Sequence, residues 1–171
     1  MSYEKEIDEN SILFKLREEQ EMKLKGGLYH QTQIRMAYNS NHMEGSRLTE
    51  DQTRSIYETR TIGVNDGYEK IDDIIETVNH FRCFDYILSI ADKELSEDII
   101  KHIQLVLKSG TLDSEKEWFA VGDYKKRPNM IGNQHMILLS MTITYPVGVA
   151  CSAIMYFIIK QNGNFLKKVS D

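Results

Sequence analysis

The residues of this sequence whose types and spacing could do chemistry lie in one short stretch, which contains Ser40, Glu44 and Gly45. Upstream, the segment from Leu28 to Met43 contains no glycine or proline, and its apolar residues fall near helical spacing. Gly45 is where such a helix would end, because glycine accepts the left-handed backbone of a helix C-terminus. Ser40 and Glu44 would share the last turn. A carboxylate held there beside a hydroxyl could compete for a cation or a phosphate site that lies opposite; the alternative is an ordinary solvated helix face.

The other reactive side chains do not indicate a second site. Cys83 and Cys151 suit neither a disulfide framework nor a zinc site, and Cys83 is interpreted as a small buried hydrophobe. His80 and His102 lie in helical patterns, where a lone histidine is more often a core or boundary residue than a ligand or a base.

Helices must position the stretch that ends at Gly45. The apolar spacing predicts helices from Ile12 to Leu24, Leu28 to Met43, Thr49 to about Thr61, Glu69 to about Ala91, and Ser96 to Gly110. Thr49 and Gln52 form a capping-box sequence, and Ser96 is a second N-cap candidate. The segment from Glu69 has the clearest apolar stripe, so it is interpreted as a core helix without chemistry.

The pattern changes between Trp118 and Ile131, where glycine, basic residues and proline predict a short hairpin. Pro128 lacks an N–H, so its strand must lie at an edge, and Arg127 before it is pushed toward extended geometry. The alternative interpretation is a basic surface loop.

Ser-x-x-x-Glu-Gly at Ser40, Glu44 and Gly45, followed by Ser-x-Leu-Thr-x-x-Gln, resembles the inhibitory helix of Fic (Fido) domain proteins, in the class that carries this helix ahead of the catalytic core. The resemblance continues through residues 72–81 and 122–132 and covers roughly the first three quarters of the chain. It implies an all-α fold with a small β-hairpin flap, and transfer of AMP from ATP to a protein hydroxyl. In the family the flap aligns an extended target segment by main-chain pairing. The flap positions here would be Tyr124, Lys125, Lys126, Arg127, Pro128, Asn129, Met130 and Ile131.

The catalytic motif of the family, His-Pro-Phe-x-x-Gly-Asn-Gly-Arg, is absent, since no histidine of this sequence is followed by Pro-Phe. In the family the histidine is the general base, the acidic residue of the motif holds Mg²⁺, and its glycine-rich turn binds the ATP phosphates. The inhibitory glutamate pairs with an arginine of the same motif. No catalytic residue or metal ligand can therefore be assigned here, and Glu44 has no motif arginine to pair with. ATP and Mg²⁺ are implied by the family only, and we expect no AMP transfer by the chain as written.

The sequence after residue 133 departs from the family pattern, so we divide the chain into a Fic-like part, 1–133, and an apolar tail, 134–171. From Met136 to Ile159 there is no charged residue. We favour, in this order, a frame slip or degenerate gene after Asn133, a packed tail, and a membrane span. Pro146 and Gly148 count against the span.

Length and charge limit the remaining choices. The chain has 171 residues, enough for one domain with a core and too few for an expected second one. The net charge of −5 argues against nucleic acid as a partner, because phosphate binding needs a basic face. The charged N-terminus has no apolar run, so we expect no signal peptide and a cytoplasmic location.

Three functions follow from these observations. The first is a Fic-family adenylyltransferase truncated before its active centre and therefore inactive. The second is a regulatory binding module that docks on a protein target or on another Fic chain through the inhibitory helix and the flap. The third, a small membrane-anchored protein, is the least favoured.

Overall fold

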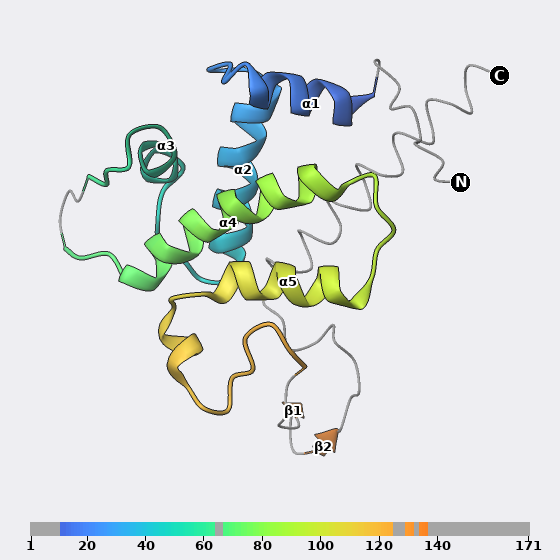
Figure 1. Cartoon of the computed structure of the whole chain (residues 1–171). Coiled ribbons are helices and arrows are strands. Elements are labelled where there is room, and N and C mark those ends of the chain that lie inside the picture. Colours follow the sequence, from blue (N-terminus) through green and yellow to red (C-terminus); the bar gives the residue numbers. More distant parts are fainter. Residues whose placement is uncertain (1–10, 64–66, 125–128, 132–133, 137–171) are drawn as a thin grey trace, which may run out of the picture.

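The structure is a computed structural model, and it describes residues 11–63, 67–124, 129–131 and 134–136. Its elements are the helices α1 (Ile12–Glu21), α2 (Leu28–Met43), α3 (Glu50–Thr59), α4 (Ile71–Ile90) and α5 (Glu97–Lys108), the 3-10 helix η1 (Leu112–Glu115), and the strands β1 (Asn129–Ile131) and β2 (Gln134–Met136). The described part is helical apart from this short strand pair (Figure 1).

Hydroxyl side chains begin three of the helices, and the sequence predicts two of these caps, Thr49 and Ser96. The Ser11 hydroxyl accepts from the N–H of Phe14 at 3.1 Å and begins α1. Thr49 and Gln52 close a capping box at the start of α3, and the N–H of Ile99 donates to the Ser96 hydroxyl at the start of α5. Because each cap satisfies backbone donors that the helix leaves open, it fixes the residue at which the helix begins.

The first helix is shorter than predicted. The sequence predicts a helix to Leu24, but α1 ends at Glu21, and Lys23 adopts a left-handed backbone with φ +51°. The α3 helix ends at Thr59, within two residues of its predicted end at about Thr61, and the left-handed backbone of Arg60, with φ +58°, terminates it there. The α2 helix has the predicted bounds, and α4 and α5 end within about two residues of theirs.

Helix α4 is the centre of the core, since it packs against α1, α2, α3 and α5 (Figure 1). In the described residues, its apolar side chains enter three buried clusters. The first, with α5, contains Cys83, Ile87, Ile90, Ile99, Ile103 and Leu107. The second, with α1 and α2, contains Leu13, Leu16, Tyr29, Phe84, Leu88 and Ala91. The third, with α2 and α3, contains Ala37, Leu48, Ile56 and Phe81. The predicted core helix is therefore confirmed, and Cys83 is a fully buried apolar residue.

The strands β1 and β2 pair antiparallel, with Met130 opposite His135. The hairpin predicted between Tyr124 and Ile131 overlaps only the first of them. Lys125, Lys126, Arg127 and Pro128 lie outside the described residues, as do residues 137–171 and with them the alternatives for the apolar tail. Of the helices that the structure does describe, none has the length and apolarity needed to cross a bilayer.

Candidate functional site

The predicted inhibitory residues lie together in the last turn of α2. The N–H of Glu44 donates to the carbonyls of Ser40 at 3.3 Å and Asn41 at 3.1 Å. Gly45 follows with φ +95°, a backbone that favours glycine, and the N–H of Ser46 returns to the carbonyl of Asn41. The helix thus ends where the sequence predicts, and Glu44 lies at its C-cap, directly after Met43.

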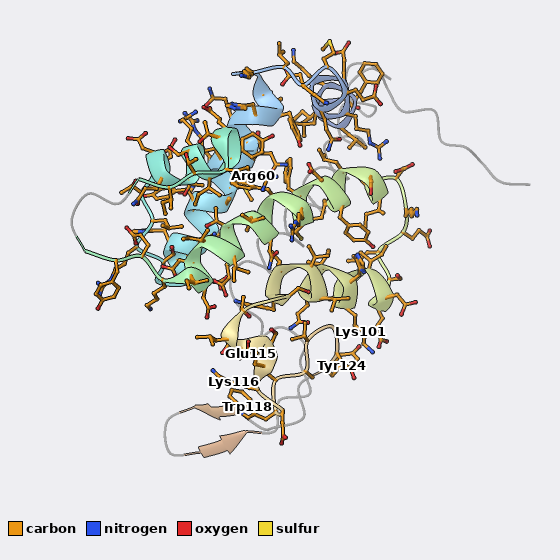
Figure 2. The ribbon with its side chains drawn as sticks, turned by 60° about the vertical axis from the view of Figure 1, so that its left-hand side comes forward. Arg60, Lys101, Glu115, Lys116, Trp118 and Tyr124 are labelled. Atoms are coloured by element: carbon orange, nitrogen blue, oxygen red, sulfur yellow. The ribbon has the colours of Figure 1, made fainter. Side chains whose placement is uncertain are left out.

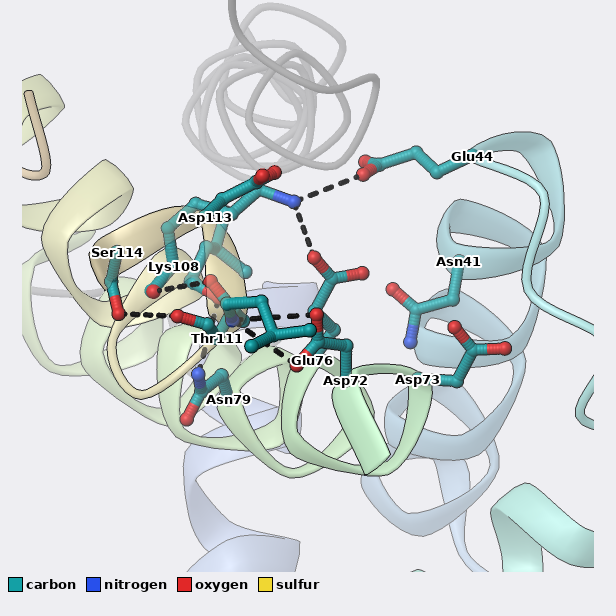
Figure 3. Close-up of polar contacts among 12 residues, drawn as sticks. Asn41, Glu44, Asp72, Asp73, Glu76, Asn79, Lys108, Thr111, Asp113 and Ser114 are labelled. Carbon is teal, nitrogen blue, oxygen red and sulfur yellow. Dashed lines mark hydrogen bonds and ion pairs between the residues drawn. The ribbon is translucent and has the colours of Figure 1, made fainter. Parts of the chain in front are cut away.

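Glu44 points toward a buried cation (Figure 3). The Nζ of Lys108, the last residue of α5, lies 3.4 Å from an oxygen of Glu44 and 2.6 Å from an oxygen of Glu76 on α4. The three side chains are 15%, 6% and 19% exposed, for Glu44, Lys108 and Glu76 in turn. We call them the Glu44–Lys108–Glu76 triad. In this triad, the positive charge of Lys108 at the end of α5 contacts the carboxylate at the end of α2.

Burial and the neighbouring charges shift the pKa values of the triad. Burial lowers the pKa of Lys108, but the carboxylates of Glu76 and Glu44 outweigh it, so the pKa stays above the ordinary value. Burial raises the pKa of Glu76, with smaller contributions from the carboxylates of Glu44 and Asp73, and Lys108 only partly offsets them. Lys108 is therefore charged at neutral pH. As the pH falls, Glu76 binds its proton at a higher pH than an exposed glutamate does.

Hydrogen bonds to α4 fix the end of α2. The Asn41 amide donates to the Thr77 hydroxyl at 2.9 Å, and Thr77 donates to the carbonyl of Asp73 at 2.7 Å. The Asp73 carboxylate accepts from the N–H of Arg47 at 3.2 Å. These contacts place the turn that follows Glu44 against α4.

A second set of hydrogen bonds fixes the end of α5 and thereby the position of Lys108. The buried Asn79 amide donates to the carbonyls of Leu107 at 3.1 Å and Ser109 at 2.7 Å. The Asp72 carboxylate, which Figure 3 labels beside Glu76, accepts from the N–H of Leu112 at 3.2 Å. The first half of α4, which the sequence indicates only as a core element, therefore also builds this site.

The segment that leads to the hairpin is held by α5. The buried Gln104 side chain accepts from the N–H of Gly122, where φ is +73°. The Nζ of Lys101 lies 3.1 Å from Asp123 and 4.6 Å from the centre of the Tyr124 ring (Figure 2). Tyr124, the first predicted flap residue, is thus anchored on the opposite end of the helix that carries Lys108. The structure places Asn129, Met130 and Ile131 in β1.

Sequence reasoning missed two residues of this site, Lys108 and Glu76. A lysine in the last turn of a helix, or a glutamate in its first turns, is ordinarily explained by the helix dipole. A helical-wheel comparison would have offered a signal, since Lys108 follows Gln104 by four residues on the same buried face of α5.

Two of three comparisons with known proteins give no match. The sequence matches no protein-family model, and no curated protein is significantly similar to it. The fold, however, is similar to the crystal structure of a Fic domain containing signaling protein from Bacteroides thetaiotaomicron, with a TM-score of 0.50 and 25% sequence identity.

This chain has a Fic-like fold. The similarity covers 70% of this chain and 45% of the Bacteroides protein, so the chain spans less than half the length of that Fic protein. The helical Fic-like architecture predicted from the motif at Ser40 to Gln52 is confirmed in this coarser form.

Proposed function

We propose that the chain is a Fic-type protein whose α2 is the inhibitory helix, with Glu44 as its inhibitory carboxylate, and that the polypeptide alone does not transfer AMP. The observation that carries the proposal is the fixed, half-buried position of Glu44 at the end of α2, inside a Fic-like fold. An inhibitory carboxylate must be held rigidly, and the hydrogen bonds of Asn41 and Asp73 hold its turn on α4.

The partner of Glu44 supports an inhibitory role of a modified kind. The family pattern pairs this glutamate with an arginine of the catalytic motif, which this sequence lacks. Here Lys108 supplies a positive charge to Glu44 at 3.4 Å. Since a carboxylate on a partly buried surface needs a compensating charge, Lys108 stabilises Glu44 in the orientation that an inhibitory contact requires.

The cofactors of the family find no ligand set in the described residues. Within residues 11–63, 67–124, 129–131 and 134–136, no group of three or more histidine, cysteine, aspartate or glutamate side chains could hold a metal ion. The sequence also lacks the glycine-rich turn of the motif. We therefore assign ATP and Mg²⁺ to no residue and derive no catalytic step through them.

The hairpin of β1 and β2 is our candidate for the target-docking flap. In the described two-stranded sheet each strand has one unpaired edge, and such an edge can pair with an extended peptide of any sequence. The anchoring of Gly122 on Gln104 would hold the base of the flap steady while its strands bind a target.

Incubation of the purified protein with labelled ATP and Mg²⁺ tests the claim of inactivity. We expect no labelled adenylate on this protein or on an added protein mixture. Robust labelling by the pure chain would refute the claim, and a Glu44→Gly variant that gains labelling would show that Glu44 inhibits an activity housed in this chain.

A second candidate function is regulation of another Fic chain, with Glu44 reaching an arginine of that chain. The observation that favours it is the second contact of Lys108, with Glu76 at 2.6 Å. Lys108 would keep this contact if Glu44 turned away. Release of Glu44 would therefore not leave a buried lysine unpaired.

The regulatory function is tested by adding this protein to an active Fic enzyme whose own inhibitory glutamate has been replaced. We expect the rate of AMP transfer to fall, and Glu44→Gly to abolish the effect. Met43→Gly is the matched control, because Met43 is 65% exposed in the same turn and its replacement keeps the carboxylate. An unchanged rate with the wild-type protein would contradict this function.

A further inference from the structure

A cavity of about 500 Å³ lies apart from the triad, where the turn between α1 and α2 approaches the end of α3 and the middle of α4. None of Glu44, Glu76 and Lys108 lines it. Its volume falls within the range of sites that hold small organic molecules.

Four cationic side chains surround the cavity: Lys23, Lys25, Arg60 and Arg82. All four are exposed, and in the described part of the chain none of them belongs to an ion pair. Arg60 stands at the end of α3, where that helix approaches α4 (Figure 2). Among the described residues, Arg82 donates only to the neutral amide oxygen of Asn79, at 3.3 Å. The guanidinium groups therefore keep most of their donors for a ligand.

The two acidic residues of the cavity do not cancel these charges. Glu58 lies 3.1 Å from the Nε2 of His30 and 3.8 Å from Arg54. Asp85 accepts at one oxygen from Tyr29 at 2.5 Å, from Gln33 at 2.8 Å and from Gln20 at 2.9 Å. Since three donors disperse the charge of Asp85, the cavity as a whole attracts an anion.

Aromatic rings supply the apolar part of the lining. The rings of Tyr57 and Phe81 meet edge to face with centroids 4.9 Å apart, and His30 contacts Tyr57 in the same way at 5.3 Å. Tyr57 is half-buried and lines the cavity beside Arg60. Rings in this arrangement offer a surface on which a flat apolar group can pack.

We propose that this cavity binds a small organic anion made of a phosphate or carboxylate group on a planar ring. The anionic group binds Arg60 and Arg82 with the lysines adding long-range attraction, and the ring packs against Tyr57. The guanidinium groups are suited to this ligand because their fork of donors matches the oxygens of a phosphate or a carboxylate.

Phenyl phosphate is the probe that tests the proposal, measured by isothermal titration calorimetry on the full chain. Inorganic phosphate and phenol, which each carry one half of this probe, are titrated as the comparison ligands. We expect phenyl phosphate to bind at least about tenfold more tightly than either half, and added salt to weaken its binding. Binding of inorganic phosphate with the same affinity would overturn the role of the ring.

Matched arginine variants locate the binding. Arg60→Gln and Arg82→Gln should each weaken phenyl phosphate about tenfold, because each removes a charge-assisted contact. Arg35→Gln is the control, since Arg35 is exposed on α2 and does not line the cavity. All three residues are exposed, so folding should survive each change, which circular dichroism verifies. Equal affinities for the three variants, or no saturable binding by the wild type, would overturn the proposal.

Discussion

Replacement of Lys108 by methionine should be among the most destabilising single changes in the described fold. The ammonium group is 6% exposed and lies between two carboxylates at 2.6 and 3.4 Å. At an effective dielectric constant of about 20, each attraction is on the order of 5 kcal/mol, and desolvation offsets much of it. Loss of the lysine removes the attraction but leaves both carboxylates half-buried, so we expect a loss of about 3 kcal/mol in the free energy of unfolding at neutral pH.

The stability lost on replacement of Lys108 by methionine should be smaller in mild acid. Burial already raises the pKa of Glu76, and removal of Lys108 takes away the positive charge that lowers it. A carboxyl group with a raised folded-state pKa binds its proton more tightly in the folded protein than in the unfolded chain. Its ionisation therefore costs stability as the pH rises through the folded-state pKa, and this cost disappears as the pH falls toward the ordinary glutamate value of about 4.3.

Urea unfolding of wild type and Lys108→Met at about pH 7 and about pH 5 measures both effects. Lys101→Met is the matched control, because Lys101 also lies between two carboxylates, Glu97 at 3.0 Å and Asp123 at 3.1 Å, but on the surface. Its loss of stability should be much smaller than that of Lys108→Met, because water screens the contacts of Lys101 with its two exposed carboxylates. The reasoning is refuted if the two lysine variants lose equal stability, or if the Lys108→Met loss is the same at both pH values. Addition of Glu76→Gln to Lys108→Met should restore part of the loss.

Three further changes test other parts of the fold. Burial lowers the pKa of His80 to about 4, so the unfolded chain binds a proton that the folded protein does not. The free energy of unfolding should therefore fall by about 3 kcal/mol as the pH drops from about 6.5 to that value. A pH series of urea titrations checks this, and His80→Gln should reduce the dependence of stability on pH. Leu88→Ala removes a fully buried side chain and should cost about 3 kcal/mol in urea unfolding, against less than about 1 kcal/mol for the exposed Leu105→Ala. Gly45→Ala should lower the thermal midpoint by straining φ at +95°, whereas Arg60→Gly should raise it by relieving φ at +58°; equal shifts for both would contradict this assignment of strain.

The helices and their caps could be predicted because local sequence decides them. Thr49 with Gln52, and Ser96 before Glu97, specify where α3 and α5 begin through hydrogen bonds to residues three positions away. Gly45 likewise specifies the end of α2 by its own backbone freedom. The early end of α1 was missed, since nothing in the residue type of Lys23 favours a left-handed backbone.

The partner of Glu44 could not be predicted in the same way, because it depends on contacts between residues distant in sequence. Lys108 lies 64 positions after Glu44 and 32 after Glu76. Its place is set by the packing of α5 on α4 and by the Asn79 amide, which holds the carbonyls at the end of α5. No local pattern records these contacts, and the motif comparison instead directed attention to an absent arginine.

The geometry of the triad makes its two carboxylates unequal, and this inequality bears on the proposed inhibition. Glu76 lies 2.6 Å from the lysine nitrogen and Glu44 lies 3.4 Å away. Attraction weakens with distance, so Glu44 is the less strongly held of the two. A competing arginine from another chain would have to replace this longer contact, while Glu76 continued to neutralise Lys108. A strong bidentate arginine–carboxylate contact could exceed the attraction that is lost. The same lysine that fixes Glu44 in the isolated chain therefore leaves it exchangeable.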